Sequence, residues 1–81
     1  MFTARGLARV KNKIRDTFES NGSILANSIE ELAYILNEPD FSTFLGYLNR
    51  LEQVDQCISL IKRDDGLYCL DYFKWNDKRK K

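Results

Sequence analysis

The spacing of apolar residues divides the chain into helical and extended segments. In the first quarter of the chain, apolar residues recur at steps of three and four, which predicts one stripe of a helix: Leu7, Val10, Ile14 and Phe18. Asn21 and Gly22 come next, and because both tolerate the left-handed backbone conformation, we expect the helix to stop there. The short apolar run SILAN, residues 23–27, then predicts one brief strand.

A second helix is predicted from Ser28, where SIEEL has the pattern of a capping box. The Ser28 hydroxyl can accept from the backbone N–H of Glu31, and the Glu31 carboxylate can reach back to the Ser28 N–H. The apolar positions of this segment form its expected buried stripe: Ile29, Leu32, Ala33 and Leu36. Pro39 prevents the helix from continuing, since the residue before a proline is pushed out of the α region.

A third helix is predicted from about Phe41 to Gln53, with Asp40 or Ser42 as its cap. Its apolar side carries Phe41, Phe44, Leu48 and Leu51, flanked by Leu45 and Tyr47. Its other side collects Ser42, Thr43, Gly46, Asn49, Arg50 and Gln53. A glycine inside a helix costs about 1 kcal/mol relative to alanine. Gly46 therefore indicates that another backbone, from a helix or a nucleic acid, approaches closely at that point.

The segments CISLIKR and LYCLDYF, rich in β-branched and aromatic residues, predict a β-hairpin. Its loop is expected to be Asp64, Asp65 and Gly66, with the glycine supplying the positive φ that such a loop requires. On one face the expected register pairs Ile58 with Tyr72, Leu60 with Leu70 and Lys62 with Tyr68. The other face then pairs Cys57 with Phe73, Ser59 with Asp71 and Ile61 with Cys69. The first face is the more apolar, as expected for a sheet that covers a core on one side.

The 81 residues suffice for one domain with a thin core, which we expect over residues 1–75, followed by a basic tail at 76–81. The net charge of +1 conceals a segregated pattern. Residues 1–15 carry five basic groups and no acid, residues 16–56 carry eight acids against Arg50, and residues 57–81 carry seven basic groups and four acids. This pattern indicates either a phosphate-binding surface assembled from the two ends or ordinary solvation of helix faces.

The residue types argue against an enzyme. The chain has no histidine and only two cysteines, Cys57 and Cys69, so the commonest general base is missing and no zinc signature is present. The hairpin register places the cysteines on different rungs, which predicts two reduced thiols. We expect no catalysis, no metal or coenzyme and no small-molecule ligand. Because no apolar run is long enough to span a membrane, we expect a cytoplasmic location.

The order helix, strand, helix, helix, hairpin, with these residues, resembles the winged helix-turn-helix family of DNA-binding domains. SIEELAYIL is similar to the second helix of that family, STFLGYLNRLE to its recognition helix, and CISLIKRDDGLYCLDYF to its wing hairpin. The resemblance extends over about residues 5–73. It implies an α+β fold with three helices and a small antiparallel sheet.

By this resemblance, helix 41–53 enters the major groove of double-stranded DNA, and the protein is a small regulator of transcription or replication. The candidate base readers are Ser42, Thr43, Asn49, Arg50 and Gln53. The candidate contacts to the DNA backbone are Arg5, Arg9, Lys62 and Arg63. A homodimer that reads two half-sites is expected, because one small winged domain offers little contact area.

The same fold could instead bind a protein. The turn before helix 41–53 carries Glu38 and Asp40, which would repel phosphates, and the exposed side of that helix has only one basic residue. The interface of such an interaction module would use Leu45, Gly46, Tyr47 and the late aromatic residues Phe73 and Trp75.

Overall fold

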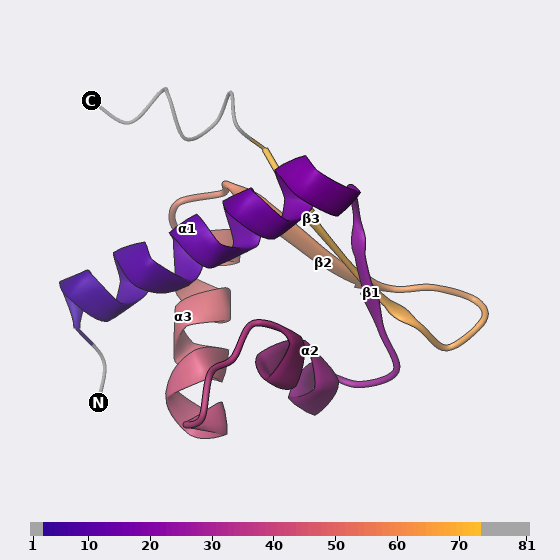
Figure 1. Cartoon of the computed structure of the whole chain (residues 1–81), viewed down its shortest axis with the longest axis horizontal. Coiled ribbons are helices and arrows are strands. Elements are labelled where there is room, and N and C mark those ends of the chain that lie inside the picture. Colours follow the sequence, from indigo (N-terminus) through magenta and orange to yellow (C-terminus); the bar gives the residue numbers. More distant parts are fainter. Residues whose placement is uncertain (1–2, 74–81) are drawn as a thin grey trace.

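Six elements form the described part of the chain, residues 3–73, in the computed structural model (Figure 1). In chain order they are α1 (Ala4–Asn21), β1 (Ile24–Ala26), α2 (Ile29–Ile35), α3 (Phe41–Gln53), β2 (Ile58–Lys62) and β3 (Tyr68–Tyr72). Three helices and a three-stranded antiparallel sheet in this order have the winged helix-turn-helix topology, which confirms the predicted α+β fold class. Trp75 and the tail expected at residues 76–81 lie outside the described residues.

Local backbone signals set both ends of α1. The Thr3 hydroxyl caps its start by accepting from the Gly6 N–H at 2.9 Å. At its other end Gly22 has φ +82°, which residues with a Cβ rarely adopt, and its N–H donates to the Phe18 carbonyl at 2.7 Å. The helix stop predicted at Asn21 and Gly22 is confirmed.

Ser28 caps α2 as predicted, accepting from the Glu31 N–H at 3.1 Å. The second half of the expected capping box is wrong, because the Glu31 carboxylate accepts from the N–H of Asn27, at 2.6 Å. β1 ends at Ala26, so the Asn27 amide lies beyond the strand ladder and takes the carboxylate as its partner. The carboxylate still ties the first turn of α2 to the end of β1.

The turn between α2 and α3 reverses the chain at Asn37, which has φ +58°. The N–H of Glu38 donates back to the Ala33 carbonyl at 2.8 Å. Asp40 then caps α3, since its carboxylate accepts from the Thr43 N–H at 3.3 Å and from the Thr43 hydroxyl at 2.8 Å. Of the two caps that the sequence allows, the structure has Asp40.

β3 is the central strand of the sheet, with β1 on one side and β2 on the other. The β2–β3 register is the predicted one, from Ile58 opposite Tyr72 to Lys62 opposite Tyr68. β1, the brief strand expected within residues 23–27, pairs antiparallel with β3. The side chains of Ile24, Ala26, Ile58, Leu70 and Tyr72 are buried on one face of the sheet, which meets the helices. The other face, the outer face, turns away from the helices.

The core lies between the three helices and the inner face of the sheet. α3 contributes four side chains, each at most 3% exposed: Phe44, Tyr47, Leu48 and Leu51. α1 adds Val10 and Ile14, and the sheet adds Ile58, Leu70 and Tyr72. In Figure 1, α1 crosses both α3 and the sheet, so that this one helix covers the seam between them.

Tyr47 is buried beneath α1, so the expectation that this residue belongs to an exposed protein interface is wrong. It is 2% exposed, and its hydroxyl accepts from the Thr3 N–H at 3.3 Å. α1 passes so close that a Cβ on Gly6 would lie 2.7 Å from the ring carbon bearing the hydroxyl, and closer still to the hydroxyl itself. Gly6 is thus a site of close helix approach that apolar spacing alone does not indicate.

We expect Gly6→Ala to lower the free energy of unfolding by about 1–3 kcal/mol, because the added methyl meets the Tyr47 ring in a packed core. Alanine favours a helix by about 1 kcal/mol over glycine, so helix propensity alone would make the variant more stable. A loss of stability would therefore indicate the steric contact with Tyr47. Urea unfolding measures it. Asn12→Ala, at an exposed position of α1, is the control and should leave stability unchanged or slightly raised. A Gly6→Ala protein more stable than wild type would show that α1 does not press on Tyr47.

Candidate nucleic-acid interface

The side of α3 that faces away from the core carries the side chains predicted to read bases. Four of them are exposed: Ser42, Asn49, Arg50 and Gln53. Thr43 is half-buried beside the helix cap, and Gly46 is half-buried in the middle of the helix. Because the apolar side of α3 is packed into the core, this polar side, called here the outward side of α3, must point away from the protein.

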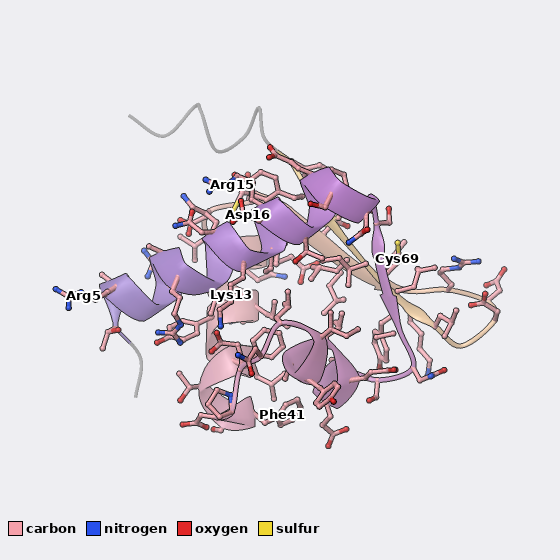
Figure 2. The ribbon with its side chains drawn as sticks, in the orientation of Figure 1. Arg5, Lys13, Arg15, Asp16, Phe41 and Cys69 are labelled. Carbon is pink, nitrogen blue, oxygen red and sulfur yellow. The ribbon has the colours of Figure 1, made fainter. Side chains whose placement is uncertain are left out.

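Glu38, in the turn before α3, is buried rather than exposed. Its side chain is 4% exposed and lies between two cations of α1. Arg9 donates to both carboxylate oxygens, at 2.9 and 3.3 Å, and Lys13 donates to one of them at 2.6 Å. Lys13 also donates to the Asn37 carbonyl at 3.2 Å, and Figure 2 shows it pointing from α1 toward this turn. Arg9, Lys13 and Glu38 are called the Glu38 cluster below.

The cluster lowers the pKa of Glu38. Burial, the largest single influence, raises that pKa by disfavouring the charged carboxylate, but the hydrogen bonds and charges of Arg9 and Lys13 together outweigh it. The pKa of Arg9 is raised in turn, first by its hydrogen bond to Glu38 and then by the carboxylate charge. Two cations and one anion leave the cluster with a net charge of +1. The expectation that Glu38 repels phosphate is corrected, because this carboxylate is covered and neutralised.

The other acids at the two ends of α3 also have partners inside the fold. Asp40 holds the first turn of α3, and hydrogen bonds from the Thr43 side chain and backbone lower the pKa of its carboxyl group. Near the end of α3, the Glu52 carboxylate accepts from the Leu60 N–H of β2 at 3.2 Å, which directs it toward the sheet. The residues of the outward side of α3 therefore include no acid, whereas two acids lie at its ends, Asp40 against Thr43 and Asp55 against Arg50.

The four candidate contacts to the DNA backbone lie toward two ends of the molecule. Arg5 is exposed near the start of α1, and Figure 2 shows it pointing away from the body of the protein. Arg9 belongs to the Glu38 cluster. Lys62 and Arg63 lie in the hairpin of β2 and β3, the wing, at the opposite end of the view in Figure 1. α2 and α3 lie between these basic groups.

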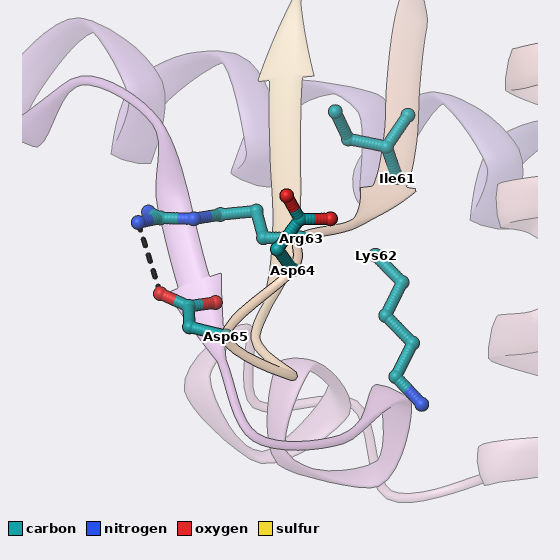
Figure 3. Close-up of a pocket in the computed structure, with 5 residues that line it drawn as sticks. All are labelled: Ile61, Lys62, Arg63, Asp64 and Asp65. Atoms are coloured by element: carbon teal, nitrogen blue, oxygen red, sulfur yellow. Dashed lines mark ion pairs between the residues drawn. The ribbon is translucent and has the colours of Figure 1, made fainter.

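The basic side chains of the wing interact with other residues of the same hairpin. Arg63 pairs with Asp65 at 3.0 Å, and the Lys62 ammonium lies 5.8 Å from the centre of the Tyr68 ring, within cation–π range. Lys62, Arg63 and Asp65 line a shallow, open hollow together with Ile61 and Asp64 (Figure 3). A phosphate at the wing would therefore compete with Asp65 for Arg63.

Comparison of the chain with protein-family models, with curated proteins and with solved structures finds no match. Within residues 3–73, no group of carboxylates and thiols is placed to hold a metal ion. In the same part of the chain, no helix has both the length and the hydropathy that a membrane span requires. Neither the buried Cys57 nor the half-buried Cys69 forms a disulfide, as their separate rungs predict. Any assignment of function therefore depends on the geometry of α3 and its surroundings.

We expect Glu38→Gln to lower the free energy of unfolding by about 1–3 kcal/mol near neutral pH, because an uncharged amide holds two cations less well than a carboxylate. The loss depends on pH in a defined direction. The pKa of Glu38 in the folded protein lies below its ordinary value of 4.5. The ionised carboxylate therefore contributes fully to the free energy of unfolding above pH 4.5, and this contribution is lost as the pH falls through the folded-state pKa. The difference in the free energy of unfolding between wild type and Glu38→Gln should therefore become smaller as the pH falls.

Urea unfolding of both proteins at about pH 7, 5 and 3 measures this difference. Asp64→Asn, which removes an exposed carboxylate at the wing tip, is the matched control and should stay close to wild type near neutral pH. A difference between wild type and Glu38→Gln that is the same at all three pH values would contradict an ionised Glu38 held by α1.

Proposed function

We propose that this protein binds double-stranded DNA with α3 in the major groove, as a small cytoplasmic regulator of transcription or replication and not as an enzyme. The observation that carries the proposal is the outward side of α3, which is polar and free of acids. The neighbouring acids are held by α1, by the helix cap and by β2. An ordinary solvated helix would present Lys and Glu at such positions, whereas a helix that reads bases needs hydrogen-bonding side chains without negative charge.

Asn49 and Gln53 are the side chains proposed to read adenine, because a side-chain amide accepts from the N6 amino group and donates to N7. Arg50 suits guanine, because its guanidinium can donate to both O6 and N7. The Arg50 guanidinium lies 3.9 Å from the Asp55 carboxylate, a long ion pair that leaves its donors able to contact a base. These three positions lie in the second half of α3.

The first half of α3 offers a different kind of contact. Ser42 is exposed one turn before Gly46, and its hydroxyl can donate to a base or a phosphate. Gly46 has no side chain beyond its backbone, so the helix can approach the floor of the groove at that point. Thr43 donates its hydroxyl hydrogen to Asp40, so its role in the proposal is to hold the start of the helix as well as to face the groove.

Contacts to phosphates are proposed to come more from α1 than from the wing. Arg5 is exposed, and the Glu38 cluster keeps a net charge of +1 beside the turn that leads into α3. In the wing, Arg63 already pairs with Asp65. With about two to four phosphate contacts, the logarithm of the binding constant should fall with the logarithm of salt concentration with a slope of roughly −2 to −4.

We expect Asn49→Ala/Gln53→Ala to lower the affinity for a duplex selected from a random pool by at least about tenfold, because each amide–adenine contact contributes about 1–3 kcal/mol. The variant keeps every charge, so its affinity for random-sequence duplex should change by less than about threefold. Fluorescence anisotropy with both labelled duplexes, at two salt concentrations, measures the two effects separately.

Ser20→Ala/Asn21→Ala, at exposed polar positions at the far end of α1, is the matched control and should bind both duplexes like wild type. The proposal would be contradicted by a wild-type chain that binds no random duplex at low salt and enriches no sequence from the pool. It would also be contradicted by a selected duplex whose affinity survives the loss of both amides.

A further inference from the structure

The outer face of the sheet carries a row of apolar side chains. Leu25 is 43% exposed and Ile61 is 56% exposed, with the half-buried Cys69 between them. The sheet register places the three side by side, because Leu25 pairs with Cys69 and Cys69 pairs with Ile61. Figure 3 views this face, with the helices behind the strands. We call Leu25, Cys69 and Ile61 the outer rung; exposed apolar side chains gathered in one row indicate a contact surface.

An acid and a base lie on opposite sides of the outer rung. Asp71 follows Cys69 by two residues on β3. Arg63 follows Ile61 by two residues, one position beyond the end of β2, and its N–H donates to the Leu67 carbonyl at 2.7 Å. Because the strands are antiparallel, these two steps lead in opposite directions. The Cys69 thiol donates to the Asp71 carboxylate at 3.7 Å, which places this acid on the outer face, and Figure 3 shows Arg63 extending across the same face.

We propose that the outer face is a self-association surface on which a second copy of this chain packs with its own outer face. In one arrangement, the two-fold axis lies between the two sheets, perpendicular to the strands and parallel to the outer rung. The outer rung of one chain then packs on the outer rung of the other. This arrangement also brings Asp71 of each chain toward Arg63 of the other copy. A two-fold axis along the strands would instead set the two Asp71 carboxylates against each other. The charge pattern therefore selects the first arrangement.

The charges also favour a second copy over an unrelated protein, because each charged group finds its opposite in the same sequence. Arg63 has Asp65 as its partner within the chain and would share or exchange it on association. The face is small, since β2 and β3 are five residues long and β1 is three. At about 4.8 Å between strands and about 3.4 Å per residue, the face covers roughly 200 Å², against roughly 800 Å² per partner in a standard interface. The dimer is accordingly weak, so its test needs high protein concentrations.

This surface and the outward side of α3 are on different elements of the fold. Packing of two sheets through their outer faces covers strands and leaves α3 of both copies open. The inference therefore stands independently of DNA binding, and its test contains no DNA.

Sedimentation velocity of the full chain, at concentrations up to about 1 mM, tests the proposal. The wild-type chain should approach twice its 9.5 kDa mass at the highest concentration. Ile61→Asp should weaken dimerisation at least about tenfold, because it sets two carboxylates against each other within an apolar contact. Val54→Asp, at an apolar residue 64% exposed at the end of α3, is the matched control and should dimerise like wild type.

Charge exchange separates this two-fold arrangement from other contacts. Arg63→Glu and Asp71→Arg should each weaken the dimer, and the double variant should restore it, with circular dichroism showing which variants are folded. A wild-type chain that is still monomeric at about 1 mM would overturn the proposal. So would a dimer that Ile61→Asp leaves unchanged, or a folded double variant that fails to recover association.

Discussion

The carboxylate of Glu38 is held in an almost completely buried position by two cations of α1, and the placement of α3 depends on this contact. A buried charge is costly unless it is paired and hydrogen-bonded, and Arg9 and Lys13 meet both conditions. The same residue ties the turn to α2, since its N–H donates to the Ala33 carbonyl. α1, α2 and the start of α3 are thereby joined at one point. The cluster also neutralises the carboxylate in the turn before α3.

Packing of the core leaves two surfaces uncovered, the outward side of α3 and the outer face of the sheet. The four buried side chains of α3 leave its outward side polar and free of acids, whereas the alternation along the strands leaves an apolar row on the outer face of the sheet. The first surface suits a groove lined with donors and acceptors, and the second suits another apolar sheet. With a net charge of only +1, non-specific attraction to DNA should be weak, so base contacts have to supply more of the affinity.

The helices and strands could be predicted from the sequence wherever the apolar residues recur with a single helical or strand spacing. The apolar steps along α3 and the alternation along β2 and β3 place helix and strand correctly, and the loop glycine Gly66, with φ +90°, sets a register that the structure confirms.

What could not be predicted is contact between distant segments. Glu38 lies 29 residues from Arg9 and 25 from Lys13, so local pattern treats it as a surface acid. The buried Tyr47 was assigned to an interface for the same reason, since only the crossing of α1 over α3 covers it. Of the candidate site, α3 was therefore predictable as a surface, whereas the engagement of its neighbouring acids was not.

Amide chemical shifts of the ¹⁵N-labelled chain, recorded while duplex DNA is added, show which surface binds DNA, because one titration reports on every described surface at once. If α3 binds the major groove, the largest shifts fall on its outward side, at Ser42, Gly46, Asn49 and Gln53, with smaller shifts around Arg5. The residues of the outer rung should stay unperturbed at protein concentrations where the chain is monomeric. Shifts confined to the wing or to the outer face of the sheet, or no shifts at all at low salt, would contradict binding through α3.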